Sequence, residues 1–171
     1  MSLRAASVDP MGGGEKKRRT KPQRSANGNE VAIEDYLCLA LYTASRAVTG
    51  YYRDLLAELE LTYPQYLVMR LLWQRGPTPV KDIGVTLALD YGTLSPLLKR
   101  LEARGLIQRE RRSDDERSVE ITLTDQGESM APQAAGVPTD LTCAVGLDEH
   151  KTDQLLATLR QITESVTAAS N

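Results

Sequence analysis

The stretch of residues 90–104 limits the possible folds of this chain most strongly. Leu94, Leu98 and Leu101 recur at helical spacing within it, so one face of a helix is expected to pack inward. Polar and basic side chains lie on the outward face: Tyr91, Thr93, Ser95, Lys99, Arg100 and, further along, Arg104. The stretch therefore predicts a short helix with a basic, solvent-facing side.

Two starting points are open for this helix. Asp90 is a good N-cap residue, and the helix would then begin at Tyr91. Ser95 followed by Pro96 also has the pattern of a cap and a proline at the first helical position, which would leave the preceding turn irregular.

A hairpin is expected directly after the helix. Gly105 suits a left-handed helix end. Beyond it, apolar residues alternate at Val119, Ile121 and Leu123. The intervening loop carries four arginines around the acidic turn of residues 113–116: Arg109, Arg111, Arg112 and Arg117. A basic helix followed by an arginine-bearing hairpin is the plan of a winged helix-turn-helix, with the helix suited to a DNA major groove and the wing to phosphates or a minor groove.

The flanking segments predict further helices. Residues 33–59 read as one long helix, residues 80–89 as the first helix of the helix-turn-helix, and Asp148 as the cap of a last helix. Pro132, Gly136 and Pro138 interrupt the segment between the wing and that last helix, so Cys143 is expected in or near a flexible connection. The terminal helices carry apolar stripes, and a two-fold homodimer would bury them.

The predicted fold is therefore mainly α with a small β wing (α+β). Residues 1–30 form a disordered basic tail and residues 31–171 the folded domain. Within that domain, residues 31–60 and 125–171 form dimerisation helices around a DNA-binding winged helix at 61–124.

A line of hydroxyl-bearing side chains accompanies Cys38 on the first helix. Tyr42, Ser45, Thr49 and Tyr52 fall within roughly 40° of it on a helical projection. The helical rise separates Cys38 from Tyr52 by roughly 21 Å, so the two cannot touch within one straight helix. If they meet, a second copy running antiparallel supplies the contact.

Charge and cysteine usage exclude several classes of protein. Residues 1–30 hold seven Lys/Arg against three Asp/Glu, and the remainder holds fourteen against twenty, so the net charge of −2 hides a basic N-terminus. The two cysteines match no zinc spacing or disulfide framework, and no apolar run suggests a membrane span. We expect a cytoplasmic protein without metal or cofactor.

Four segments in order resemble the MarR family of bacterial repressors, and specifically its organic-hydroperoxide branch, the OhrR-type regulators. They are residues 37–46 (LCLALYTASR), 61–66 (LTYPQY), 92–102 (GTLSPLLKRLE) and 115–118 (DERS). The resemblance spans about residues 33–168. It implies a homodimeric repressor that binds pseudo-palindromic double-stranded operator DNA and responds to an organic hydroperoxide as inducer, and it implies no enzymatic activity.

The resemblance also assigns roles to individual residues. Cys38 would be the redox-sensing thiol, and Tyr42, Tyr52 and Tyr63 would surround it, the last two from the other subunit. Their O–H groups would stabilise the thiolate that attacks a peroxide. Cys143 would be the resolving cysteine, which forms a disulfide with Cys38 across the dimer. The expected DNA-binding side chains are Tyr91, Thr93, Ser95, Pro96, Lys99, Arg100, Asp115 and Arg117.

The chain departs from the family pattern at three places. Tyr91 stands where the family commonly has serine, which puts the operator sequence in question. Leu39 stands where phenylalanine is frequent, and the basic N-terminal tail has no usual counterpart.

Other functions are compatible with parts of this pattern. One is a MarR-type repressor that answers a phenolic or other small ligand, in which Cys38 is a small buried hydrophobe and Cys143 an inert loop cysteine. Another is a thiol peroxidase, although the basic helix and wing would then have no explanation.

Overall fold

The computed structural model describes residues 32–111 and 119–170 of the chain, without the side chains of Arg111 and residues 138–141. The described residues divide into two units, one ending at Thr43 and the other beginning at Ala44, with the boundary inside helix α1 (Leu37–Leu55). The described part of the first unit contains the 3-10 turn η1 (Ile33–Asp35) and the beginning of α1. No helix among the described residues is long and apolar enough to cross a membrane.

The first helix is shorter than the sequence predicted. Tyr36 is extended, which separates η1 from α1, and the α-helix ends at Leu55 rather than near Leu59. After it, turns lead to Glu60, whose backbone is left-handed with φ of +51°. A long helix cannot pass through such a residue, because the left-handed conformation breaks the i to i−4 hydrogen-bond ladder.

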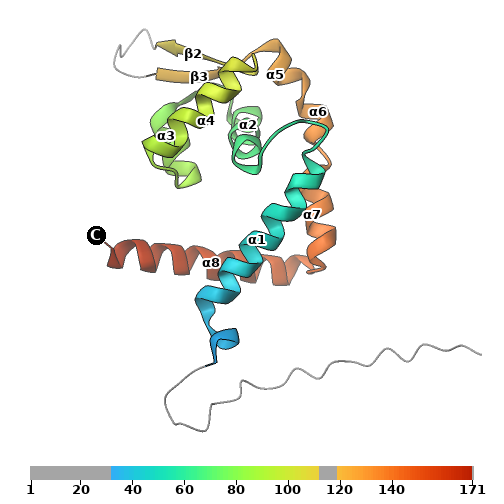
Figure 1. Cartoon of the computed structure of the whole chain (residues 1–171), viewed down its shortest axis with the longest axis vertical. Helices are drawn as coiled ribbons and strands as arrows, with labels where there is room; N and C mark the ends of the chain where they lie inside the picture. Colours follow the sequence, from blue (N-terminus) through green and yellow to red (C-terminus); the bar gives the residue numbers. More distant parts are fainter. Residues whose placement is uncertain (1–31, 112–118, 171) are drawn as a thin grey trace, which may run out of the picture. The chain divides into compact units, whose positions relative to one another are not determined.

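Three helices and a small sheet form the winged helix in the second unit (Figure 1). The helices are α2 (Tyr63–Arg75), α3 (Val80–Leu87) and α4 (Tyr91–Ala103). Thr62 is the N-cap of α2, with Gln65 completing a capping box. Of the two possible starts for α4, Asp90 is the cap: its carboxylate accepts a 2.9 Å hydrogen bond from the Thr93 N–H, and Pro96 lies inside the helix.

The sheet has three antiparallel strands in the order β1-β3-β2. Strands β2 (Ile107–Arg111) and β3 (Val119–Leu123) form the predicted hairpin, with Arg109 opposite Ile121. Strand β1 (Thr78–Pro79) pairs with the far edge of β3. Strand β1 was not predicted, because two residues are too few to show an alternating pattern.

One hydrophobic core connects α2, α3, α4 and the sheet. The leucines predicted for the inner face of α4 are buried, together with Ile83 from α3 and Ile121 from β3. The core also includes Tyr52, near the end of α1, and Leu56, directly after it. The outward face of α4 is thereby fixed by packing on its opposite side.

The C-terminal segment is more helical than the sequence suggested. It comprises α5 (Asp125–Ser129), α6 (Ala131–Ala134), α7 (Val137–Val145) and α8 (Glu149–Ala169). The predicted cap of α8 at Asp148 is present, and its side chain accepts from the Lys151 N–H at 2.8 Å. The expectation of a flexible connection around Cys143 is wrong, because this residue lies in α7. Pro132 and Pro138 occupy the first turns of α6 and α7, where a proline costs no hydrogen bond.

Candidate functional site

Helix α4 has a buried apolar face and, opposite it, an exposed polar face. Tyr91, in its first turn, is 72% exposed, and Lys99 and Arg100 are exposed further along. Pro96 is exposed and Ser95 half-buried. The outward positions predicted for Tyr91, Lys99 and Arg100 are confirmed, whereas Ser95 faces solvent only in part.

The Thr93 hydroxyl already has a partner within the helix end. It donates to the Asp90 carboxylate at 2.9 Å, beside the backbone hydrogen bond that caps α4. These two hydrogen bonds hold the pKa of Asp90 below its usual value. The Thr93 hydroxyl oxygen keeps its lone pairs, so toward a further group it acts as an acceptor.

The described part of the wing is joined to α4 by an ion pair. The Arg109 Nε lies 3.1 Å from the Glu102 carboxylate, and the Arg109 Nη2 is buried without a hydrogen-bond partner among the described residues. Asp115 and Arg117, predicted to contact DNA, lie outside the described residues.

A cavity of about 770 Å³ lies between α3, α4 and the sheet. Its lining includes the apolar Val85, Leu89 and Val119 and the polar or charged Lys81, Tyr91 and Arg109. This cavity was not predictable from the sequence, because its walls come from three separate segments.

Three tyrosines cluster where the end of α1 meets α2. The Tyr52 and Tyr63 rings have centroids 4.4 Å apart, and the Tyr66 ring lies 5.8 Å from that of Tyr52. Burial, followed by the neighbouring phenols, raises the pKa of Tyr52 to about 12, and burial also raises the pKa of Tyr63 and Tyr66. The phenols of this cluster therefore stay protonated at neutral pH.

The predicted redox residues are divided between the two units. Cys38 and Tyr42 belong to the first, and both are exposed, Tyr42 at 58%. Tyr52, Tyr63 and Cys143 belong to the second, and Cys143 is exposed on α7. The structure brings Tyr52 and Tyr63 together, whereas the meeting of either with Cys38, and of Cys38 with Cys143, stays a prediction. Among the described residues, no group of three or more His, Cys, Asp or Glu side chains could hold a metal ion.

Sequence comparison identifies the family. The MarR family model matches residues 61–119. The organic hydroperoxide resistance transcriptional regulator of Bacillus subtilis is 42% identical over 127 residues, which cover 74% of this chain and 84% of that protein. This chain belongs to the MarR family. As a MarR-family regulator it has the winged-helix fold expected from its sequence, and the expectation of a transcriptional regulator rather than an enzyme is confirmed.

Solved MarR-family structures agree with this fold. The crystal structure of AbfR of Staphylococcus epidermidis is 34% identical and covers 77% of this chain and 91% of its own, with a TM-score of 0.65. The structure of reduced AbfR bound to DNA is 31% identical and covers 79% of this chain and 92% of its own, also with a TM-score of 0.65.

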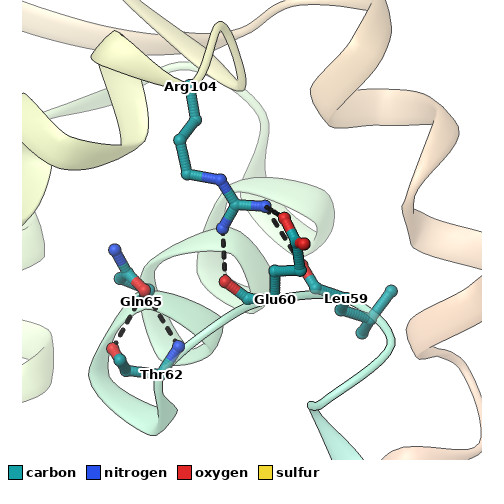
Figure 2. Close-up of polar contacts among 5 residues, drawn as sticks. All are labelled: Leu59, Glu60, Thr62, Gln65 and Arg104. Carbon is teal, nitrogen blue, oxygen red and sulfur yellow. Dashed lines mark hydrogen bonds and ion pairs between the residues drawn. The ribbon is translucent and has the colours of Figure 1, made fainter.

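Two residues of this MarR-family chain have contacts that the sequence pattern did not predict. Tyr66 was not assigned a role, yet it is only 2% exposed, it joins the tyrosine cluster, and its hydroxyl has no hydrogen-bond partner among the described residues. Its place three residues after Tyr63, on the same helical face, was the available signal. Arg104 was assigned to the DNA-facing surface, but its guanidinium turns to Leu59 and Glu60 (Figure 2). A pattern of basic residues does not show whether each of them faces solvent.

Proposed function

We propose that this protein is a homodimeric repressor that releases its operator when an organic hydroperoxide oxidises Cys38. The observation that carries the proposal is the pairing of two protonated phenols, the buried Tyr52 and the half-buried Tyr63, on the helices that the family resemblance assigns to peroxide sensing. The 42% identity to an organic hydroperoxide resistance regulator supports the same conclusion.

DNA binding would use the exposed face of α4 together with the wing. Tyr91, Thr93, Lys99 and Arg100 would enter the major groove, and Ser95 and Pro96 would lie alongside. Arg117 would reach from the wing into the minor groove, with Asp115 beside it. In a two-fold dimer the half-sites would be spaced by about one helical turn, roughly 34 to 36 Å, so the operator would be an imperfect palindrome. The DNA-bound structure of reduced AbfR supports DNA binding by this winged helix.

A homodimer is supported by apolar side chains that the chain leaves uncovered. On α8, Leu155, Leu156, Leu159 and Val166 are exposed. Exposed apolar side chains in a row on one helix are typical of an interface. A second copy of the chain would bury them and would also supply Tyr52 and Tyr63 to the Cys38 of its partner.

The proposed redox reaction needs only the Cys38 and Cys143 thiols and the hydroperoxide, which is the oxidant. The Cys38 thiolate attacks the terminal, hydrogen-bearing oxygen of the hydroperoxide, the O–O bond breaks, and the leaving alkoxide takes a proton from solvent to become an alcohol. Cys38 is left as a sulfenic acid. The Cys143 thiol of the other subunit then attacks that sulfur, which forms a disulfide and releases water.

A second candidate is regulation by a small ligand, which the cavity between α3, α4 and the sheet favours. Its buried Arg109 Nη2 lacks a hydrogen-bond partner among the described residues, and such a donor suits a carboxylate or phenol oxygen. In that case Cys38 would take no part, and Cys38→Ser would respond to inducer like the parent protein.

The deciding experiment is a gel shift on the DNA upstream of the protein's own gene. The reduced protein should bind, cumene hydroperoxide should release it, and a thiol reductant should restore binding. Cys38→Ser should bind equally well and stay bound in peroxide, because a serine hydroxyl does not ionise near neutral pH. Release of Cys38→Ser by peroxide would contradict the assignment of the sensor.

A further inference from the structure

The connection between α1 and α2, residues 56–61, is held in a defined shape. Its buried members are Leu56, Leu59 and Leu61. Glu60 has a left-handed backbone with φ of +51°, which a residue other than glycine keeps only where its surroundings impose it. The connection leads directly into Thr62, whose backbone N–H donates to the Gln65 side chain at 2.9 Å in the first turn of α2. A change in this connection therefore changes where α2 begins.

Arg104 holds the connection from the end of α4 (Figure 2). One guanidinium nitrogen donates to the Glu60 carbonyl. The other donates to the Leu59 carbonyl at 3.3 Å and lies 3.4 Å from the Glu60 carboxylate. That carboxylate is 82% exposed, so the ion pair contributes little and the two carbonyl bonds carry the contact. Two neighbouring carbonyls suit the planar fork of arginine better than the single ammonium of lysine.

Arg104 contacts the connection from the end of α4 that is opposite the exposed first turn of the helix. Arg104 is the C-cap of the helix, and Tyr91 is at its other end, about 20 Å away for 13 residues. A small rotation about the C-terminal end therefore moves the exposed N-terminal turn appreciably. Beyond the Leu59 and Glu60 carbonyls that Arg104 binds, Tyr63 follows Glu60 by three residues and packs against Tyr52. One side chain thus links the tyrosine pair to the end of the recognition helix.

We propose that Arg104 is a positioning residue that couples the oxidation state of the sensing site to the orientation of α4. This inference rests on the proposed redox function. On oxidation, Tyr63 and the start of α2 shift, and this shift moves residues 59–60. The Arg104 guanidinium then transfers the movement to α4. Arg104 itself makes no contact with DNA.

The test compares Arg104→Gln and Arg104→Lys with Glu60→Gln as the matched control. Glu60→Gln keeps both carbonyl acceptors and removes only the exposed charge. For each folded variant, operator affinity is measured over a salt series in the reduced and the peroxide-oxidised form, together with the rate at which peroxide consumes the Cys38 thiol. Arg104→Lys retains the aliphatic stem and the charge, so it serves where Arg104→Gln does not fold.

In the Arg104 variants, the ratio of the oxidised to the reduced dissociation constant should be smaller than that of the parent by about fivefold or more. The rate of Cys38 oxidation should match the parent, and Glu60→Gln should match it throughout. A ratio equal to that of the parent would reduce Arg104 to a structural role. A salt slope lowered by about one would make it a phosphate contact instead. Either outcome overturns the inference.

Failure of the proposed function would look different, because the parent protein itself would then show a ratio of one. The coupling through Arg104 would then fall together with the proposed function, whereas a parent ratio above one that persists unchanged in the Arg104 variants would overturn this inference alone.

Discussion

The ring of Tyr63, in the first turn of α2, packs against the ring of Tyr52 from α1, with centroids 4.4 Å apart and planes inclined by 34°. Burial raises the pKa of both phenols above the ordinary value, and for Tyr52 the pKa reaches about 12. Both groups are therefore hydrogen-bond donors across the physiological pH range. Two donors fixed side by side are suited to stabilise a thiolate brought against them.

Replacing Tyr63 with phenylalanine should slow oxidation of Cys38 by roughly tenfold or more, because a hydrogen bond to a charged group contributes about 1.5–3 kcal/mol. The measurement is the rate of thiol loss under limiting cumene hydroperoxide in a Cys143→Ser background, where Cys38 is the remaining cysteine. Tyr51→Phe is the matched control, since Tyr51 is an exposed neighbour on α1. Equal rates in Tyr63→Phe and Tyr51→Phe would remove Tyr63 from the sensing site.

The raised pKa of Tyr52 predicts a loss of stability at alkaline pH. Tyrosine ionises near pH 10 in the unfolded chain and near pH 12 at position 52 in the folded one. Between these values the folded state holds the extra proton, so the contribution of Tyr52 to stability is complete below pH 10 and falls as the pH rises toward 12. The free energy of unfolding of the parent should therefore drop relative to that of Tyr52→Phe over this interval. Urea denaturation at pH 9 and pH 11 checks it, and parallel pH curves for the two proteins would contradict it.

The fold of the winged helix was predictable because its signals are local. The spacing of Leu94, Leu98 and Leu101 defines which face of α4 is buried, and the cap of α2 at Thr62 is recognisable from residue type alone. These features depend on neighbours within about four residues, the range over which a sequence pattern is informative.

Arg100 is predicted to contact the operator directly, because it is exposed on α4, whereas Arg104 is engaged within the chain. Arg100→Ala should weaken operator binding by about 1–3 kcal/mol if it reads a base, or lower the salt slope by about one if it binds a phosphate. Fluorescence anisotropy with labelled operator over a salt series measures both quantities. Arg160→Ala, an exposed arginine on α8, is the control and should leave both unchanged.

Gly127 should tolerate no side chain. A Cβ at this position would lie 2.0 Å from the Leu106 carbonyl oxygen, and the Gly127 carbonyl accepts a 2.9 Å hydrogen bond from the Trp73 indole. Gly127→Ala should therefore lower the free energy of unfolding by about 1–3 kcal/mol or more, since the backbone must shift. Thermal or urea denaturation measures the loss. Glu128→Ala, at the exposed neighbouring position, should change stability far less.

Contacts between distant segments account for what the sequence did not reveal. Arg104 and Glu60 are 44 positions apart, so the sequence shows a basic residue on a helix but not the carbonyls that it binds. Cys143 was misplaced for another reason: proline and glycine were interpreted as interruptions, whereas Pro138 occupies the first turn of α7. Proline has opposite effects at the start and in the middle of a helix, and the sequence alone did not say which position applied.

The last prediction concerns the disulfide between Cys38 of one chain and Cys143 of the other. Both thiols are exposed, which allows a peroxide and then a second thiol to reach them. We expect the two sulfurs to be too far apart to bond in the reduced dimer, because a disulfide requires Cα atoms within about 7 Å. Closing that distance must displace α7. Because α7 is a formed helix, it must either move as a rigid body or unwind in part. The movement would change the spacing of the two recognition helices and so release the operator.

Nonreducing gel electrophoresis after one equivalent of cumene hydroperoxide measures this outcome. A covalent dimer should form in the parent protein and be absent from both Cys38→Ser and Cys143→Ser. Cys143→Ser should still lose its Cys38 thiol to peroxide at the parental rate, because the first oxidation step does not involve the resolving cysteine. A monomeric band with overoxidised Cys38 in the parent would show instead that Cys143 takes no part, and that an external thiol completes the switch.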